Sequence, residues 1–388
     1  MKAFQTTNRR QFLKTTALGA LGSGMLFSNS SAKPIADETK QNGVTAKIKK
    51  LEVLLHKRRP NPNPVRDAIQ TLPGIGSVEV KVTSDDGVSG SGEIYFGRIK
   101  GSLDALKSVI ENELKPLVLG SELAYIRRTF ENMIRETDYH GAFGLSTLGI
   151  SAIDTALWDC LGKTLDLPCW QIWGGCNTRL PAYANVGWLN YTDKKIQQEC
   201  EEAVSNGYRA IKIKIGYPTM REDIKRVKAV REVIGENTRL MVDANQALTV
   251  GEAIMRGKAF EDLGCYWFEE PIPAQDVEGY KKIADELKIQ LATGENLCSP
   301  QNFALFIKRD AVDIVQPDLR RSGGPTALLE IGRMAHTFGI PYASHGGEAA
   351  HMSVMACLPN TIYVETGGER PLIDGKASIP QGPGFSWE

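Results

Sequence analysis

From residue 180 onward the sequence alternates between short apolar runs and stretches with helical periodicity. Apolar runs of this kind predict buried strands, and strands that alternate with helices predict a parallel sheet. Eight such runs are enough to close a barrel, so we expect an α/β fold, a modified TIM barrel of the (β/α)7β type. The runs are residues 182–186, 210–215, 240–245, 266–271, 291–296, 313–319, 341–345 and 362–366.

Three of these runs end in a carboxylate, namely Asp243, Glu269 and Glu295. A (β/α) barrel carries its functional groups at the carboxyl ends of its strands. A helix cap explains any one of them equally well, but three that converge would repel one another, and burial strengthens that repulsion. A hard divalent cation neutralises such a set, so the three residues are predicted to bind Mg²⁺, ahead of Ca²⁺ or Mn²⁺.

The other strand ends also carry charged side chains. Lys212 and Lys214 occupy alternate positions of one run, so both face the same side of the strand. Asp318, His345 and Glu365 stand near the ends of the last three runs. Charged side chains are seldom buried unless they are paired or bind a metal, so these residues are predicted to be catalytic.

A smaller domain precedes the barrel. Residues 46–165 begin with strand-like runs, two of them joined by Ser84-Asp85-Asp86-Gly87, and continue with helical patterns at 103–117, 124–136 and 149–163. Strands followed by helices predict an α+β capping domain. We expect the barrel to occupy residues 166–370, and a segment rich in Gly and Pro, residues 371–388, to return to the cap.

A polar loop at residues 56–66 carries Arg58 and Arg59 next to prolines that restrict its backbone. Buried hydroxyl groups need hydrogen-bond partners, whereas an aryl acid needs apolar neighbours. Donors in the cap therefore favour a polyhydroxylated or dianionic acid, and Arg58 and Arg59 are predicted to bind substrate. The alternative is that they only keep the loop solvated.

The first residues are predicted to be a signal and not part of the fold. Arg9 and Arg10 precede an uncharged stretch that ends in Ser30-Ser31-Ala32. Residues 1–32 resemble a twin-arginine export signal, which predicts a periplasmic protein. The stretch is too polar for a stable membrane anchor, which needs about 20 mostly apolar residues. The alternative is a disordered basic tail.

Composition excludes some classes of protein. The 388 residues carry 46 Lys and Arg and 46 Asp and Glu, so the formal net charge is zero. The lack of a basic surplus argues against a nucleic-acid partner. The seven cysteines form no CxxC pair and do not describe a disulfide framework, and most of them are predicted to be buried packing residues.

Short motifs recur at the ends of the predicted strands, namely Lys212-Ile213-Lys214-Ile215-Gly216, Val242-Asp243-Ala244-Asn245-Gln246, Trp267-Phe268-Glu269-Glu270-Pro271, Gly294-Glu295-Asn296, Pro317-Asp318 with Gly323-Gly324, Ser344-His345 and Val364-Glu365. Together these motifs resemble the mandelate racemase group of the enolase superfamily (the mandelate racemase/muconate lactonizing enzyme family). The resemblance extends from about residue 47 to the C-terminus and includes residues 152–159. The mandelate racemase branch is favoured because no lysine follows Asp318, which is paired with His345 instead.

The resemblance implies a metal-dependent reaction on a small carboxylic acid. Asp243, Glu269 and Glu295 would hold one Mg²⁺ per subunit, with Mn²⁺ as a substitute, and stabilise the ene-diolate formed when the α-proton leaves. Lys214 would be one base, with its pKa lowered by the charge of Lys212 and by the metal. Lys212 would also touch the substrate carboxylate.

The same resemblance assigns the residues that act on the opposite face of the substrate. His345 would be the base or acid there, with Asp318 holding its other ring nitrogen and fixing the tautomer. Glu365 would be protonated and donate a hydrogen bond to the developing oxyanion. Asn245 would contact a substrate hydroxyl. The resemblance also implies a symmetric homo-oligomer.

Several reactions fit these residues. We expect dehydration of a sugar acid to a 2-keto-3-deoxy acid. The alternatives are a racemase or epimerase of a 2-hydroxy acid, a cycloisomerase acting on a lactone or anhydro sugar acid, and a non-catalytic periplasmic acid-binding protein. Binding alone needs no paired base, so Lys214, His345 and Asp318 argue against the last.

The export signal can be tested directly. Replacing Arg9 and Arg10 by lysine should trap the precursor in the cytoplasm without changing the folded enzyme, because a twin-arginine signal requires both arginines. Cell fractionation and N-terminal mass spectrometry would measure this. Wild-type protein found only in the cytoplasm, with residues 1–32 attached, would contradict the prediction.

Overall fold

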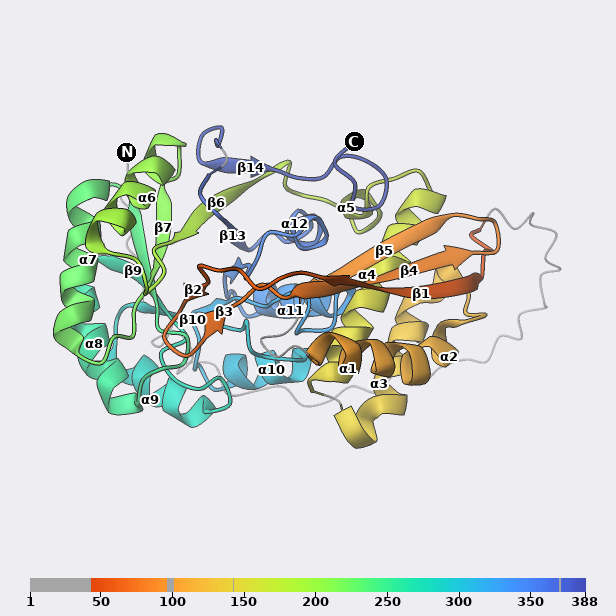
Figure 1. Ribbon diagram of the computed structural model, residues 1–388, viewed down its shortest axis with the longest axis horizontal. Coiled ribbons are helices and arrows are strands. Elements are labelled where there is room, and N and C mark those ends of the chain that lie inside the picture. The colour runs from red at the N-terminus through yellow and green to blue at the C-terminus, as the bar shows by residue number, and fades with distance from the viewer. Residues whose placement is uncertain (1–42, 96–100, 142, 370) are drawn as a thin grey trace, which may run out of the picture. The chain divides into compact units, whose positions relative to one another are not determined.

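The computed structural model describes residues 43–95, 101–141, 143–369 and 371–388 (Figure 1). The predicted signal, residues 1–32, lies outside this part of the chain. Within the described residues, none of the helices combines the length and the apolar character needed to cross a bilayer.

Eight parallel strands form a closed barrel. Neighbouring strands pair in chain order, and the last strand pairs with the first, where Glu365 lies opposite Tyr183. The strands are β6 (Arg179–Val186), β7 (Ala210–Lys214), β8 (Arg239–Asp243), β9 (Cys265–Glu269), β10 (Gln290–Thr293), β11 (Ile314–Val315), β12 (Tyr342–Ala343) and β13 (Thr361–Thr366). The closed barrel confirms the predicted modified TIM fold.

A helix follows each of the first seven barrel strands, so the (β/α)7β pattern is complete (Figure 1). Capping boxes start two of the helices, where Thr219 pairs with Glu222 and Thr249 with Glu252. The helices are α6 (Asp193–Ser205), α7 (Met220–Ile234), α8 (Val250–Asp262), α9 (Val277–Glu286), α10 (Pro300–Lys308), α11 (Pro325–Thr337) and α12 (Ala349–Met355).

The barrel has two apolar layers. Alternate strand residues pack inside it, where Tyr183, Met241, Trp267 and Tyr363 form a core around the barrel axis. The other strand residues face outward and pack against the helices. Because side chains alternate along a strand, inward-facing apolar residues fill the interior below the carboxyl ends of the strands.

The capping domain is an antiparallel sheet packed on helices. Strands β1 (Ile48–Lys57), β4 (Gly76–Ser84) and β5 (Ser89–Tyr95) pair in the order β1-β4-β5. The hairpin predicted at Ser84-Asp85-Asp86-Gly87 joins β4 to β5. The helical elements are α1 (Ser102–Val109), η2 (Ile110–Leu114), α2 (Lys115–Val118), η3 (Leu123–Tyr125), α3 (Ile126–Gly141) and α4 (Leu145–Thr164), followed by α5 (Cys169–Ile172).

One predicted helix is interrupted. The pattern at residues 103–117 predicts a continuous α-helix, but residues Ile110–Leu114 form a π-helical segment. Pro116 has no backbone N–H to give to the residue four positions earlier, so regular hydrogen bonding cannot continue through it. The segment packs on Gly149 of α4, where a Cβ would lie 2.7 Å from Leu114 Cδ1.

A small hairpin of the cap lies against the barrel mouth. It consists of β2 (Val65–Arg66) and β3 (Thr71–Leu72). The chain after β6 binds it through backbone contacts, since Leu189 N donates to Arg66 O at 2.8 Å and Arg66 N donates to Asn190 Oδ1 at 3.0 Å. The loop at residues 56–66 therefore begins a cap segment that reaches the functional end of the barrel.

The C-terminal segment joins both domains. Strand β14 (Lys376–Ser378) pairs antiparallel with β6 of the barrel. Farther on, Phe385 N donates to Asp159 Oδ1 of α4 at 3.1 Å, and Asp159 Oδ2 accepts from Ser91 N of β5. All seven cysteines have free thiols, so no disulfide contributes to this arrangement.

Helix α4 fixes the loop between β11 and α11. Ser151 Oγ donates to Leu319 O at 2.7 Å. Asp154 accepts from Thr326 N at 2.8 Å and from Thr326 Oγ1 at 2.7 Å, next to the N-terminus of α11. This loop follows Asp318, so a helix of the cap holds a segment that carries a predicted catalytic residue.

Asp154 should make stability depend on pH. Burial raises the pKa of this carboxyl to about 7, against the hydrogen bonds from Thr326. The folded state therefore favours the protonated form, and its contribution to stability is lost as pH rises from about 4 to about 7. The free energy of unfolding in urea should fall by about 3 kcal/mol between pH 5 and pH 8 because of this group.

Asp154→Asn removes the titrating group and is the matched variant. Its unfolding free energy should change less between the two pH values than that of the wild type. An equal pH dependence in both proteins would contradict the assignment.

Candidate active site

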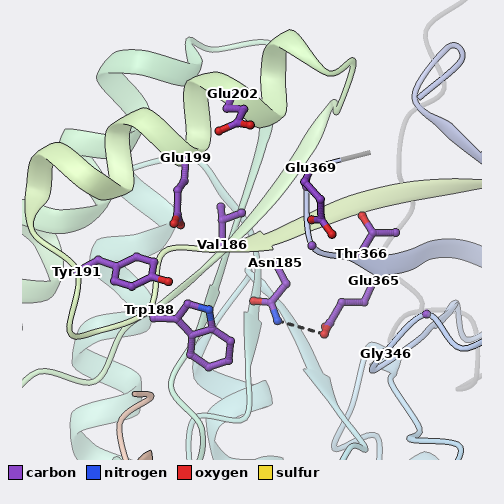
Figure 2. A pocket seen from close by; sticks show the side chains of 13 residues that line it. Asn185, Val186, Trp188, Tyr191, Glu199, Glu202, Gly346, Glu365, Thr366 and Glu369 are labelled. Atoms are coloured by element: carbon purple, nitrogen blue, oxygen red, sulfur yellow. Dashed lines mark hydrogen bonds between the residues drawn. The ribbon is translucent and has the colours of Figure 1, made fainter. Parts of the chain in front are cut away.

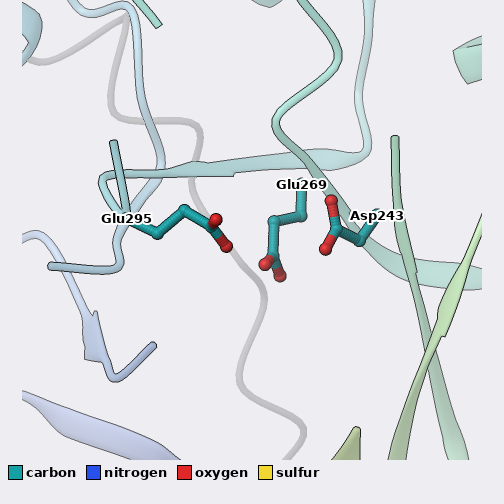
Figure 3. A group of neighbouring side chains, drawn as sticks. All are labelled: Asp243, Glu269 and Glu295. Carbon is teal, nitrogen blue, oxygen red and sulfur yellow. The ribbon is translucent and has the colours of Figure 1, made fainter. Parts of the chain in front are cut away.

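The three predicted metal ligands meet at the barrel mouth. Asp243 ends β8, Glu269 ends β9, and Glu295 follows β10 by two residues. All three are buried, and one carboxylate oxygen from each lies within 4.8 Å of the others (Figure 3). Charges this close must be balanced by cations.

Local backbone geometry directs these side chains inward. Gly294 has φ +145, and a Cβ there would lie 2.7 Å from Phe303 Cε1 and 2.8 Å from the Gln316 backbone. Only glycine allows the chain to turn tightly against β11 and place Glu295 next to Glu269. Asn245 and Glu270, which follow the other two ligands closely, also have positive φ, a costly conformation for non-glycine residues that recurs at active sites.

Two lysines of β7 neutralise part of this charge. Lys214 Nζ contacts Asp243, and Lys212 Nζ lies 2.7 Å from Glu269 Oε1 and 2.8 Å from Glu365 Oε2. Burial acts to lower the pKa of Lys214, but the carboxylates of Asp243, Glu295 and Glu269 together raise it more, so the net pKa is above its usual value. Lys212 lowers the pKa of Lys214, as predicted, but this effect is smaller than the rise caused by Asp243.

The donor set fits a divalent cation. Three carboxylates from adjacent strands offer hard oxygen ligands, which is the chemistry Mg²⁺ prefers. Glu295 Oε2 and Asn245 Oδ1 are buried and accept no hydrogen bond from the described residues. A cation held by Asp243, Glu269 and Glu295 would also neutralise part of the Asp243 charge. That charge raises the pKa of Lys214, so the cation would lower it.

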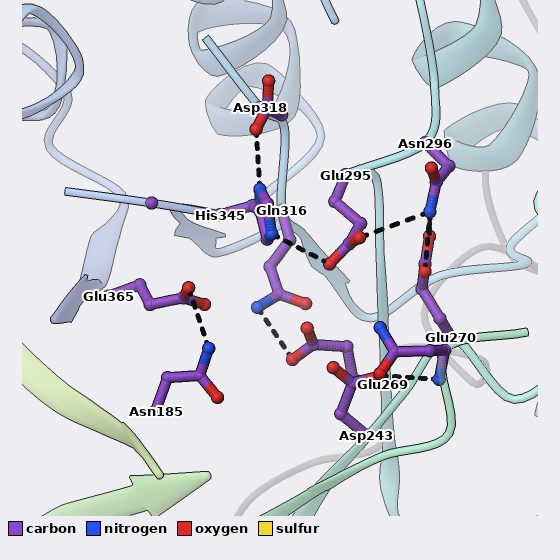
Figure 4. A network of polar contacts seen from close by, with 12 residues as sticks. Asn185, Asp243, Glu269, Glu270, Glu295, Asn296, Gln316, Asp318, His345 and Glu365 are labelled. Carbon is purple, nitrogen blue, oxygen red and sulfur yellow. Dashed lines mark hydrogen bonds and ion pairs between the residues drawn. The ribbon is translucent and has the colours of Figure 1, made fainter. Parts of the chain in front are cut away.

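His345 and Asp318 form a hydrogen-bonded pair on the other side of the triad. His345 Nδ1 lies 2.6 Å from Asp318 Oδ2, and Nε2 lies 3.3 Å from Glu295 Oε2 (Figure 4). Burial alone would lower the pKa of His345, but Glu295 and Asp318 raise it above its usual value. The imidazole is thus held as a proton donor, with its orientation set by Asp318.

Glu365 differs from the expectation of a protonated acid. Burial acts to raise its pKa, but the ammonium of Lys212 and the charge of His345 lower it well below the usual range. Glu365 accepts hydrogen bonds from Lys212, Tyr183 and Asn185. The expectation was wrong, because closure of the barrel puts β7 and β13 on either side of β6 and brings Lys212 to Glu365, 153 positions away in the sequence.

The remaining predicted residues lie at different distances from this centre. Asn245 is buried next to the triad, and its backbone N donates to Asp243 Oδ1 at 2.8 Å. Arg58 and Arg59 are exposed on the segment that leads to the cap hairpin. Their contact with substrate stays a prediction.

Several polar residues of the site were missed. Gln316 Nε2 donates to Glu269 Oε2 at 3.0 Å, and Asn296 Nδ2 donates to both oxygens of the buried Glu270. Gln316 stands two positions before Asp318, so strand periodicity could have placed it on the same face. Other residues in the network are Asn185, Tyr183, Trp267, Arg320 and Arg321.

A cavity of about 480 Å³ adjoins Glu365. Figure 2 shows Asn185 and Glu365 on one side of it and the acidic side chains of Glu199, Glu202 and Glu369 on the other. Trp188 also lines the cavity, and its ring lies 5.3 Å from Lys214 Nζ. The cavity therefore adjoins the site at two places, at Glu365 and at Trp188, whose ring lies near Lys214.

Family models match both domains. Residues 195–388 match the enolase C-terminal domain-like family, and residues 50–174 match the N-terminal domain of mandelate racemase / muconate lactonizing enzyme. An arabinonate dehydratase of Saccharolobus solfataricus is 36% identical over 78% of this chain and 83% of its own length. A 3,6-anhydro-alpha-L-galactonate cycloisomerase of Streptomyces coelicolor is 30% identical over 79% and 87%.

A solved structure extends the comparison. The L-talarate/galactarate dehydratase of Salmonella typhimurium LT2, liganded with Mg and L-lyxarohydroxamate, has a TM-score of 0.82 and 30% identity. The match covers 92% of this chain and 94% of that one. That relative carries magnesium, the metal that the acidic triad of this chain suits.

A capped barrel with three buried carboxylates, two lysines and a histidine–aspartate pair defines a class of enzymes that are lyases or isomerases. The chain belongs to this class as a member of the enolase superfamily, in its mandelate racemase group. Its relatives act on small carboxylic acids, sugar acids among them.

Glu269→Gln should weaken metal binding. The substitution removes one of three carboxylate ligands and the negative charge that lies 2.7 Å from Lys212 Nζ. Affinity for Mg²⁺, measured by titration calorimetry, should fall by about tenfold or more, and turnover should fall with it. Chelation should abolish wild-type activity and added Mg²⁺ should restore it. Normal turnover by fully demetallated protein would show that the triad is not the metal site.

Proposed function

We propose that this enzyme dehydrates a sugar acid to a 2-keto-3-deoxy acid. The observation that carries the proposal is the placement of two basic groups at opposite ends of the triad. Lys214 contacts Asp243 at one end, and His345 lies 3.3 Å from Glu295 at the other. A substrate over the triad would therefore have a proton acceptor on one side and a proton donor on the other.

Lys214, once deprotonated, takes the α-proton of the substrate. Lys212 lies beside Lys214 on β7 and supplies positive charge to the substrate carboxylate. Bound Mg²⁺ would stabilise the negative charge that develops when the α-proton leaves. His345 gives its proton to the departing β-hydroxyl, so the C–O bond breaks and water leaves. The resulting enol tautomerises to the 2-keto-3-deoxy acid.

A second reaction uses the same residues. If Lys214 and His345 act on opposite faces of one carbon, the product is the epimer of the substrate. The similarity to a cycloisomerase supports a third, in which His345 protonates a different leaving group. Dehydration is favoured because His345 is held as a proton donor and because sugar-acid dehydratases are among the relatives.

Isotope exchange separates these reactions. Lys214→Ala should abolish dehydration and reduce exchange of the α-proton with D₂O by about 100-fold or more, because proton transfer by a positioned side chain contributes that much. His345→Asn should block dehydration while exchange through Lys214 continues. NMR of the substrate and an assay for 2-keto product measure the two steps. Full exchange and full turnover in both variants would show that neither residue transfers protons.

The cavity beside Glu365 favours a monocarboxylate. Glu199, Glu202 and Glu369 line the side opposite Glu365, and no ion pair of Glu202 or Glu369 with a described residue is found within 4.0 Å. A substrate hydroxyl can donate to these carboxylates, whereas a second substrate carboxylate would be repelled. We therefore propose an aldonic acid over an aldaric acid as the substrate.

Aldonic and aldaric acids of equal length should differ by about tenfold or more in kcat/KM, in favour of the aldonic acid. The double variant Glu202→Gln/Glu369→Gln should reduce that ratio because it removes two of the repelling charges. Glu201→Gln is the matched control, since Glu201 is exposed on the same helix and does not line the cavity. An unchanged ratio in the double variant would contradict this preference.

A further inference from the structure

The catalytic pair is built from two separate loops. Asp318 follows β11, and His345 follows β12. A backbone hydrogen bond from His345 N to Pro317 O, 3.2 Å, joins the loops. The Nδ1–Oδ2 contact of 2.6 Å joins them a second time (Figure 4). The position of the imidazole relative to Glu295 therefore depends on how firmly these two loops are held together.

Arg320 provides a further connection between the same loops. Its Nη2 lies 2.7 Å from Asp318 Oδ2, and its Nη1 lies 3.2 Å from Glu348 Oε1. Glu348 stands three residues after His345, at the start of α12. The guanidinium thus links the loop of Asp318 to the loop of His345, and it does so through the same Asp318 oxygen that receives the imidazole.

The geometry around Glu348 depends on a glycine. Gly346 has φ +79, and a Cβ there would lie 2.6 Å from Glu348 Oε2. Any other residue would displace this carboxylate, so glycine allows Glu348 to fold back toward Arg320. Ser344 Oγ donates to Gly346 O at 2.5 Å and holds the turn.

Both carboxylate oxygens of Asp318 accept hydrogen bonds. Oδ1 accepts the backbone N–H groups of Arg320 and Arg321 at 2.8 and 2.9 Å and a longer bond of 3.3 Å from Arg320 Nε, while Oδ2 is shared between His345 and the Arg320 side chain. Without the guanidinium, Oδ2 would be held only by the imidazole it is meant to orient. The Arg320 side chain is 17% exposed, so its charge-assisted bonds are only partly screened by water.

We propose that Arg320, held by Glu348, is a positioning residue for His345. It acts through Asp318 and does not contact the substrate. The inference rests on the proposed function for its kinetic consequence, since His345 transfers a proton there. Its structural content, the orientation of the imidazole, does not depend on which acid is the substrate.

Kinetics of Arg320→Gln, Arg320→Lys and Glu348→Gln test the first consequence. Loss of an outer partner of a reacting group costs about 10- to 100-fold in rate. For Arg320→Gln we expect kcat of dehydration to fall by that factor, with KM within about twofold and α-proton exchange through Lys214 retained. Arg320→Lys should lose less activity, because lysine keeps the positive charge but lacks the guanidinium that contacts Asp318 through one nitrogen and Glu348 through the other.

The matched control is Lys258→Gln, which removes an exposed ion pair to Glu286 at 3.1 Å, far along the chain from both loops. This variant should keep wild-type kinetics. A large rise in KM with kcat preserved in Arg320→Gln would overturn the inference, because it would mean that Arg320 binds substrate directly.

A second measurement is independent of turnover. The chain has five histidines, so the Nδ1–H resonance of His345 in ¹⁵N-histidine-labelled, Mg²⁺-loaded enzyme can be assigned with His345→Asn. The resonance should shift in Arg320→Gln and Glu348→Gln and stay in place in Lys258→Gln. An unchanged resonance in the first two overturns the inference, and so does a shifted resonance with unchanged kcat.

Failure of the proposed function and failure of the role proposed for Arg320 give different results. If the wild type converts no sugar acid, the proposed function is wrong, and the resonance alone decides the role of Arg320. If the wild type is active and the Arg320 variants retain both kcat and the resonance, the role assigned to Arg320 is wrong and the function stands. Arg320→Lys serves if Arg320→Gln does not fold.

Discussion

The balance of buried charge at the barrel mouth is the constraint on which the rest of the site depends. Asp243, Glu269 and Glu295 converge there, and Lys212 and Lys214 approach them from the neighbouring strand. A buried carboxylate is stabilised in its charged form when a cation lies close by. Glu365 and Asp318 follow the same rule, because each contacts a buried or half-buried cationic side chain. The metal that the triad is suited to hold would complete this balance.

The sequence alone could predict the barrel and the identity of most charged residues in the site. Strand periodicity and chain order place Lys214, Asp243, Glu269 and His345 at strand ends, and a parallel barrel brings all strand ends to one mouth. These features are local, and a closed barrel converts them directly into proximity. The order of the strands in the structure agrees with the order of the predicted runs.

What the sequence could not provide is the pairing between distant strands. The ionised state of Glu365 depends on Lys212, which comes from the opposite end of the barrel sequence. Gln316 and Asn296 are neutral, so a search for charged strand ends passed over them. The sequence shows that no lysine follows Asp318, but it does not show a role for Arg320. Nothing in the order of residues indicates that Glu348 folds back to contact Arg320.

Helix α4 and the hairpin of β2 and β3 belong to the same cap but contact different parts of the barrel. The hairpin lies against the chain after β6, whereas Ser151 and Asp154 of α4 fasten the loop that carries Asp318 and Arg320. The contact with the chain after β6 and the anchor of the catalytic loop are thus supplied by separate elements of one domain. Evolution, or a protein engineer, can exchange the hairpin for another sequence while the catalytic loop keeps its anchor, and a chimera that replaced the entire cap would lose that anchor.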